Sequence, residues 1–338
     1  MSLFTPLHLR SVTAQNRLWI SPMCMYSVFA EDGIATDWHL AHYGSRAVGG
    51  AGLIIVEATA VEPRGRITGR DLGLWDDAQI PALARMAHLM AVNGAVPAVQ
   101  LGHAGRKATV PGAIGPSPLA FSTDYATPQE MTQGDIEQVI LAFQQAAGRA
   151  RDAGFQAVEI HSAHGYLLHQ FMSPLSNQRD DSYGGDFDNR VRLHLEVVRA
   201  VRAVWPDHLP LLVRISATDW REGGWDLEQS VELARRLAGE GVDLMDVSSG
   251  GLSAAQQIQP APGYQVPFAQ RIRRETGVAT GAVGLISEAQ QANAIVRDGQ
   301  ADAVLIARQS LRDPYWPLRA ARDLGVELPV PTQYRRGW

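Results

Sequence analysis

The sequence contains one cysteine, Cys24, and one lysine, Lys107, in 338 residues. A single cysteine excludes intramolecular disulfides and iron–sulfur clusters held by several cysteines. It is also typical of a reducing compartment, so we expect the protein to be cytoplasmic. With a single lysine, the chain has only one candidate for a Schiff base with a carbonyl substrate.

Charged residues are scarce too, at 19%, and the formal net charge is −5. Without a dominant basic face we expect no binding to nucleic acid. The sequence lacks an apolar run of about 18 residues, the length that spans a bilayer, so we expect no membrane partner. Residues 1–18 lack the charged head and apolar stretch of a signal peptide. Hydrophobic residues make up 46%, which is enough for a packed core.

Eight short apolar runs alternate with longer amphipathic stretches. Each run is nearly continuously apolar, which is typical of parallel strands that are covered on both faces. Between them, residues 135–152 repeat apolar side chains at helical spacing. Asp226 and Gly241 predict the start and the end of another helix, and "SEAQ" (287–290) predicts a capping box. The predicted strands are 17–23, 52–59, 96–102, 156–162, 211–217, 243–249, 278–284 and 301–307.

This alternation predicts an α/β protein with a (β/α)₈ TIM barrel, formed by residues 1–338 as one domain. Residues 103–130 are rich in glycine and proline, and we expect them to pass over the barrel mouth. Such barrels place their chemistry where strands end and the following loops begin. The residues predicted at those ends are Cys24, Gln100, His103, His161, His164, Arg214, Ser249, Gly284 and Arg308.

One of these ends carries the segment "IHSAHGY" (160–166), with two histidines and a tyrosine. Zinc on a helix is typically held by histidines four apart with a glutamate between them, and this pattern is absent. A lone buried histidine is usually structural, but two at a strand end indicate a site. Two neutral imidazoles, His161 and His164, can each donate an N–H to one substrate oxygen. Tyr166 can then supply a proton. We therefore predict an oxygen clamp and no metal.

Two other ends predict a phosphate site. Gly284 and Arg308 follow the seventh and eighth strands, whose loops recurrently bind phosphate in barrels. Backbone N–H groups and a guanidinium suit a phosphate dianion. No Walker or G-x-G-x-x-G pattern is suitably placed. The pattern therefore favours a mononucleotide or a sugar phosphate over a dinucleotide in a Rossmann fold.

Three further residues at strand ends have more than one interpretation. Arg214 in an apolar strand needs a partner, either a carboxylate such as Asp246 or a ligand that becomes anionic. Gln100 can bind the amide-like edge of a ring. Cys24 is either a small buried hydrophobic residue or a residue that tunes a redox ligand.

Taken together, eight segments resemble the old yellow enzyme family of flavin-dependent ene-reductases. The resemblance is to the branch called thermophilic-like, which includes bacterial xenobiotic reductases. It extends from about residue 16 to the last residue. The segments are "SPMCMYS", "TDWHLAHYGSRAVGGAGLIIVEATAV", "QLGHAGRKA", "IHSAHGYLLHQFMSPLSNQRDDSYGG", "RISATDW", "AVGLI", "LRDPYWPLRAA" and "QYRRGW".

The resemblance implies FMN at the barrel mouth. Cys24 would lie near the N5/O4 edge of the flavin and tune its potential, and Arg214 would lie beside N1/O2. The family has Gly-Arg after the last strand, whereas this chain has Ala307 and Arg308. An alanine held in a left-handed conformation there would be strained. The implied cofactor-binding residues are Ser21, Pro22, Met23, Cys24, Ala58, Gln100, Arg214, Gly284, Ala307 and Arg308.

The resemblance also implies the reaction. NADPH reduces FMN and leaves, and then an α,β-unsaturated carbonyl compound binds. His161 and His164 polarise its oxygen, flavin N5 delivers hydride to Cβ, and Tyr166 protonates Cα. Tyr26 and Lys107 would line the substrate site. Enones, maleimides, nitro compounds, other xenobiotics and phenolic ligands fit such a site.

The C-terminal "QYRRGW" ends in Arg335, Arg336 and Trp338. The resemblance implies that an arm of about residues 329–338 brings Arg336 into the active site of a neighbouring subunit. We therefore expect a homodimer or homotetramer.

Other classes of protein share some of these features. A phosphate-binding aldolase or isomerase would also use Gly284 and Arg308. It needs a Schiff-base lysine or a carboxylate base at a strand end, and Lys107 lies in a loop. Dienoyl-CoA reductase relatives need an iron–sulfur cluster and a second nucleotide domain, which one cysteine and this length exclude. A protein that stores flavin or binds phenols without turnover remains an alternative.

Overall fold

In the computed structural model, which describes residues 1–337, eight parallel strands close into a barrel. Their order around the barrel is β10-β11-β12-β3-β4-β5-β8-β9. The predicted (β/α)₈ fold is therefore confirmed. The strands are β3 (Leu18–Ile20), β4 (Leu53–Ala60), β5 (Val96–Gly102), β8 (Ala157–Ser162), β9 (Leu211–Ser216), β10 (Leu244–Ser248), β11 (Ala279–Val283) and β12 (Ala303–Ile306).

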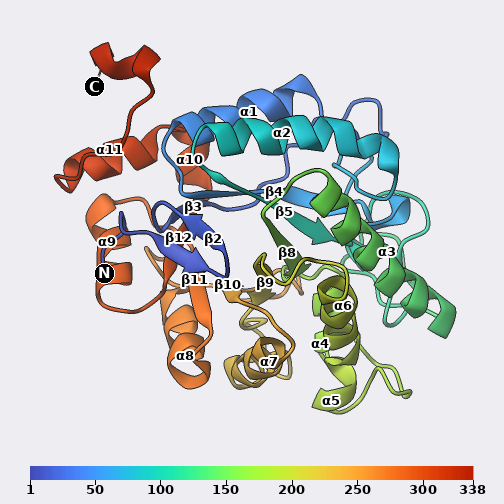
Figure 1. Cartoon of the computed structure of the whole chain (residues 1–338). Coiled ribbons are helices and arrows are strands. Elements are labelled where there is room, and N and C mark those ends of the chain that lie inside the picture. Colours follow the sequence, from blue (N-terminus) through green and yellow to red (C-terminus); the bar gives the residue numbers. More distant parts are fainter. Residues whose placement is uncertain (338) are drawn as a thin grey trace.

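Helices surround these strands (Figure 1). The longer ones are α1 (Asp37–Val48), α2 (Ile80–Val92), α3 (Gln133–Asp152), α6 (Arg192–Arg202), α7 (Leu227–Gly239), α8 (Val266–Thr276), α9 (Ala289–Arg297) and α11 (Trp316–Asp323). Short helices are α4 (Leu167–Met172), α5 (Phe187–Arg190) and α10 (Arg308–Arg312), with 3₁₀ turns η1 (Pro63–Gly65), η2 (Asp77–Gln79), η3 (Gly105–Lys107) and η4 (Thr332–Gly337). Two small sheets pair β1 (Leu7–Leu9) with β2 (Val12–Ala14), and β6 (Ile114–Gly115) with β7 (Gln129–Glu130).

The helix-start predictions had mixed outcomes. Asp226 caps α7 by accepting a hydrogen bond from Gln229 N, as predicted. The capping box at 287–290 was wrong, because α9 begins at Ala289 and Glu288 makes no side-chain cap. The side chain that reaches back is that of Gln291, whose Oε1 accepts a hydrogen bond from Ser287 N at 3.4 Å, and not that of Gln290 as the four-residue pattern indicated.

The strands are apolar throughout because helices cover one face and the barrel interior covers the other. The interior holds a cluster of buried side chains distinct from the larger core beneath the helices. Its residues are Leu7, Ala14, Trp19, Leu53, Ile55, Val96, Ala98, Ala157, Leu212, Leu244, Val283, Ala303 and Leu305. In β8, Glu159 and His161 continue the face of Ala157, because side chains alternate along a strand. The interior therefore becomes polar toward the carboxyl ends of the strands.

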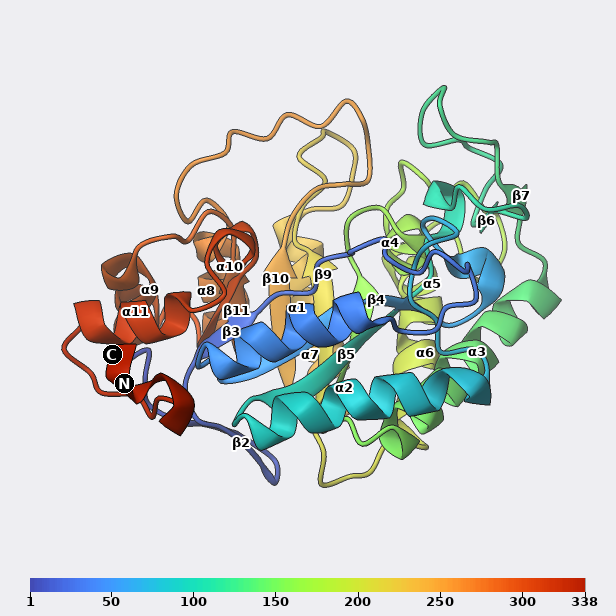
Figure 2. The same ribbon diagram turned by 90° about the horizontal axis from the view of Figure 1, so that it is seen from above.

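Long loops rise above that end of the barrel (Figure 2). One follows β10, and another carries η3, β6 and β7 between β5 and α3. Lys107, in the second loop, donates hydrogen bonds to backbone carbonyls in the loops after β8 and β10. The start of residues 103–130 therefore reaches the loops at the barrel mouth, as expected. Within residues 1–337, no helix is long and apolar enough to cross a membrane.

Candidate active site

The two histidines and the tyrosine of the clamp lie together at the end of β8. The ring centroids of His161 and His164 are 5.3 Å apart, and those of His161 and Tyr166 are 4.9 Å apart. A sharp turn produces this grouping, because His164 and Gly165 have φ values of 58° and 74°. A Cβ at Gly165 would lie 2.3 Å from the carbonyl oxygen of Gly251, so only glycine fits. The sequence predicted this grouping correctly.

All three groups are electrically neutral in this environment. Burial, and then the nearby Arg214, hold the pKa of His161 and of His164 well below the ordinary value. Each ring therefore carries one N–H and one bare nitrogen. Burial also raises the pKa of the Tyr166 phenol well above its usual range, so the phenol keeps its proton. The arrangement offers hydrogen-bond donors to a substrate oxygen, with a proton source beside them.

The loop after β3 supplies Cys24 and Tyr26. The strand ends at Ile20, earlier than predicted, so Ser21, Pro22, Met23 and Cys24 all belong to this loop. Burial, followed by the charge of Glu57, raises the pKa of the Cys24 thiol, which therefore stays protonated. Tyr26 is 42% exposed and has a φ of 50°.

Two carboxylates near this loop were missed in the sequence. Glu57 accepts hydrogen bonds from Met25 N (3.1 Å) and the Tyr43 hydroxyl (2.9 Å), and so anchors the loop. Its signal was an acidic residue inside the apolar run "LIIVEATA" (53–60). Asp71 lines a narrow cleft together with Ala58, His161 and Tyr166. Burial raises the pKa of Asp71 to about 6.

Four polar side chains form a layer inside the barrel, below the clamp. Gln100 Nε2 donates to Glu159 Oε1 at 2.7 Å, and Arg214 Nε lies 3.1 Å from Asp246 Oδ2. The interpretation that Arg214 pairs with Asp246 is therefore confirmed. Burial, and then Asp246, raise the pKa of Glu159 well above its usual range, so Glu159 holds a proton. The sequence missed Glu159, although it stands two residues before His161 in the same strand.

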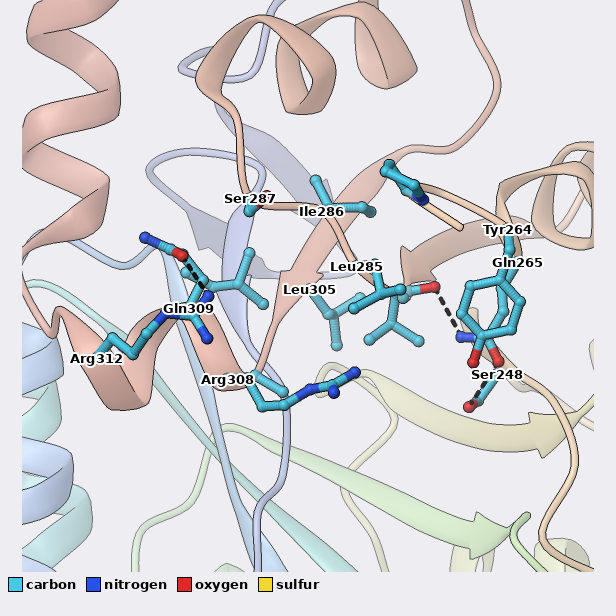
Figure 3. Close-up of a pocket in the computed structure, with 15 residues that line it drawn as sticks. Ser248, Tyr264, Gln265, Leu285, Ile286, Ser287, Leu305, Arg308, Gln309 and Arg312 are labelled. Carbon is cyan, nitrogen blue, oxygen red and sulfur yellow. Dashed lines mark hydrogen bonds between the residues drawn. The ribbon is translucent and has the colours of Figure 1, made fainter. Parts of the chain in front are cut away.

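A cavity of about 390 Å³ lies where β11 and β12 end. In Figure 3, Arg308 extends across it toward the side where Ser248 and Gln265 lie. Gly284 has a φ of 122°, and a Cβ there would lie 2.7 Å from Gln265 Nε2. Ala307 has a φ of −114°, so the strain considered for an alanine at this position does not arise. The structure thus places Gly284, Ala307 and Arg308 together in one pocket.

Lys107 lies at the barrel mouth, where hydrogen bonds to backbone carbonyls occupy its amino group. Its Nζ donates to the carbonyl oxygens of His164 (2.9 Å) and Gly251 (3.1 Å). It lies 4.4 Å from the ring centroid of Phe121 and 5.2 Å from that of Tyr166. Burial, and then Arg106, lower the pKa of Lys107 to about 8. These ties favour a structural role over Schiff-base chemistry.

Other strand-end residues from the sequence have structural partners. His103 Nε2 lies 2.8 Å from Glu62 Oε1, and His103 lines the same narrow cleft as His161 and Tyr166. Ser249 donates its hydroxyl proton to Gln265 Oε1 at 2.6 Å. At the other end of the chain, Arg336 is exposed in η4, and its reach into a neighbouring subunit stays a prediction. Trp338 lies outside the described residues.

Comparisons with known proteins place the chain among flavin oxidoreductases. The model of the NADH:flavin oxidoreductase / NADH oxidase family matches residues 2–327. The chain is similar to an NADPH dehydrogenase of a Geobacillus species, with 53% identity over 99% of this chain and 98% of that protein. It is also similar to an NADPH dehydrogenase of Listeria innocua, with 50% identity over 99% of both chains.

Solved structures give the same result. Morphinone reductase in complex with tetrahydroNAD superposes with a TM-score of 0.81 and 30% identity, covering 98% of this chain and 93% of that one. The old yellow enzyme homologue from Zymomonas mobilis gives 0.83 and 26%, with coverages of 98% and 94%.

Proposed function

Because this chain belongs to the NADH:flavin oxidoreductase / NADH oxidase family, which includes old yellow enzyme, we propose that it is an FMN-dependent NADPH dehydrogenase acting as an ene-reductase. Its acceptors would be α,β-unsaturated carbonyls such as enones and maleimides, and also nitro compounds. The observation that carries the proposal is the neutral cluster of His161, His164 and Tyr166 beside a pocket suited to phosphate. The name of the Geobacillus and Listeria relatives supports NADPH as the hydride donor.

The residues present fit FMN. Gly284 lines the cavity at a point where a Cβ would come too close to Gln265 Nε2. Arg308 extends into the same cavity, where its guanidinium would balance the charge of a phosphate. The buried Ser21 hydroxyl has no hydrogen-bond partner within residues 1–337, so it would be free to donate to a ring above the barrel interior. Arg214 Nε makes the ion pair with Asp246, so the rest of its guanidinium would face the ring. FMN, when bound, supplies hydride transfer between the nicotinamide and the acceptor.

The other residues that would contact the FMN ring are proposed from their places at the carboxyl ends of the strands. Ser21, Pro22, Met23 and Cys24 would line one edge of the ring from the loop after β3, as we proposed from the resemblance. Ala58 and Gln100 would approach it from β4 and β5. Arg214 would stabilise negative charge on the ring, although Asp246 shares its guanidinium.

The clamp would select and polarise the acceptor. Two N–H groups from His161 and His164 would hold one carbonyl or phenolate oxygen, and their bonds strengthen as negative charge develops there. Tyr166, which keeps its proton, would deliver it to the substrate Cα. Tyr26 and Lys107 would shape the entrance to the site.

We also propose one FMN-binding barrel domain spanning residues 1–338. Its C-terminal arm, residues 329–338, would bring Arg336 to a neighbouring active site in a homodimer or homotetramer. The exposure of η4 supports this proposal.

The direct test of cofactor binding is the visible spectrum of the purified protein. We expect a yellow protein with an FMN absorption band, or an apoprotein that gains the band when FMN is added. A colourless preparation that takes up no FMN would refute the proposed function.

A further inference from the structure

The two clamp histidines use opposite ring nitrogens for their internal contacts. His161 Nδ1 accepts a hydrogen bond from Ala163 N at 3.3 Å, and no partner within residues 1–337 contacts its Nε2. His164 Nε2 lies 2.8 Å from Ser248 Oγ, and its Nδ1 has no such partner. The nitrogens left for a substrate oxygen are therefore His161 Nε2 and His164 Nδ1.

This pairing constrains where the protons must be. Each imidazole is neutral and carries a single N–H, because its pKa is held low. The contact from Ala163 leaves the His161 proton on Nε2, where it can be donated. For His164 to donate through Nδ1, its Nε2 must be bare and must accept a hydrogen bond. Ser248 is the residue that can supply that bond.

The surroundings of Ser248 determine which way its hydroxyl points. Gln265 Nε2 donates to the Val283 carbonyl at 2.8 Å, which turns Gln265 Oε1 toward Ser248 and Ser249. Trp220 Nε1 can only donate, and it lies 2.9 Å from Ser249 Oγ. Ser249 therefore accepts from Trp220 and donates to Gln265 Oε1 at 2.6 Å.

The Ser248 hydroxyl has two possible hydrogen-bond acceptors, and they lie at different distances. The hydroxyl lies 3.4 Å from Gln265 Oε1, which Ser249 already occupies, and 2.8 Å from His164 Nε2. A contact of 3.4 Å is at the long end for an O–H···O bond, so the imidazole is the better acceptor. We propose that Ser248 is a positioning residue that donates to His164 Nε2 and thereby keeps the His164 proton on Nδ1, facing the substrate. Its consequence for phenol binding rests on the proposed function, but the proton's position does not.

The chain contains a matched control. Ser162 Oγ lies 2.9 Å from His194 Nε2, a buried serine–histidine pair of the same kind. Ser162 neighbours His161 in β8 but, by strand alternation, points to the opposite face. Ser162→Ala therefore removes an equivalent hydrogen bond without touching the clamp.

The test uses the purified protein labelled with ¹⁵N at histidine. Ring nitrogens that carry a proton are distinguished from bare ones by their ¹⁵N chemical shifts, and the His164→Ala spectrum assigns the His164 signals. In the wild-type protein we expect the proton on Nδ1. In Ser248→Ala we expect it to move at least partly to Nε2, whereas Ser162→Ala and Ser248→Thr leave it on Nδ1. A wild-type proton on Nε2, or no change in Ser248→Ala, would overturn the proposal.

A second measurement tests the consequence. With FMN saturating, the dissociation constant of 4-hydroxybenzaldehyde is followed by the change in the flavin spectrum. Binding should weaken in Ser248→Ala by the inverse of the fraction of molecules that keep the proton on Nδ1, about 10-fold if roughly one tenth keep it, with little change in Ser162→Ala. Unchanged affinity in Ser248→Ala would overturn the positioning role. If no protein binds FMN or phenol, the proposed function fails, while the NMR result still decides the position of the proton.

Discussion

His161 and His164 form a clamp without charge. Burial and the neighbouring Arg214 keep both imidazoles neutral, and in the proposed reaction their N–H groups would stabilise an oxygen that becomes negative. Tyr166, 4.9 Å from His161 between ring centroids, keeps its proton for the same reason of burial. The proposed chemistry depends on the N–H protons of His161 and His164 and on the hydroxyl proton of Tyr166. Single substitutions at these residues can therefore test it.

Removing either clamp histidine should separate the two half-reactions. We expect His161→Ala or His164→Ala to slow oxidation of the reduced enzyme by cyclohexenone by about 100-fold, since one oxyanion donor contributes about 3 kcal/mol. Reduction by NADPH should slow less. Anaerobic stopped-flow measurements check both rates. Equal losses in the two half-reactions, with FMN still bound, would contradict the clamp.

Tyr166→Phe should slow reoxidation by cyclohexenone by about 10²-fold, the usual contribution of general acid catalysis. FMN binding should be unchanged. Because the pKa of Tyr166 is raised, the wild-type rate should show no loss from ionisation of this phenol up to pH 10. A pH series of the oxidative half-reaction measures this. A fall in rate near pH 8 that Tyr166→Phe abolishes would show that the phenol ionises earlier than we infer.

Cys24→Ser should change the flavin potential and leave turnover intact. Cys24 is a protonated thiol in a loop that Glu57 holds, so its role would be to contact the ring and not to attack the substrate. Spectroelectrochemical titration of both proteins measures the potential. Complete loss of activity with FMN bound would instead indicate covalent participation.

At the scale of elements, most of the candidate site residues lie in the loops that follow the strands. Lys107 connects three of these loops, those after β5, β8 and β10. Its ammonium group links its own loop to the carbonyls of His164 and Gly251. The sequence located the strands well because each is covered on both faces, and it predicted that His161, His164 and Tyr166 lie together because they are close in the chain. Glu57, Asp71 and Ser248 were missed because their partners or the site lie far away in sequence.

Lys107 should give stability a specific dependence on pH. Its pKa is lowered from 10.5 to about 8 in the folded protein, so between these values the unfolded chain binds a proton that the folded chain does not. Stability relative to Lys107→Met should therefore rise as pH increases from about 8 toward 10.5, by about 3 kcal/mol at most. Urea unfolding of both proteins measures the difference. A difference independent of pH would contradict the lowered pKa.

For the whole molecule, the barrel interior changes character along its axis. An apolar cluster fills one part, and the layer of Gln100, Glu159, Arg214 and Asp246 leads toward the clamp. The general position of the site could be predicted from the sequence because barrels bind ligands where strands end. The pairing inside this layer could not, because it depends on which strands are neighbours once the barrel closes.

The central claim is that one site accepts hydride from NADPH and passes it to an activated C=C bond. The most direct measurement reduces the FMN-loaded protein with one equivalent of NADPH under anaerobic conditions and then adds cyclohex-2-enone, following the flavin band and the product. We expect the band to bleach and then return, with cyclohexanone formed in equal amount. A band that bleaches but does not return with the enone would contradict the claim and favour a flavin- or phenol-binding protein.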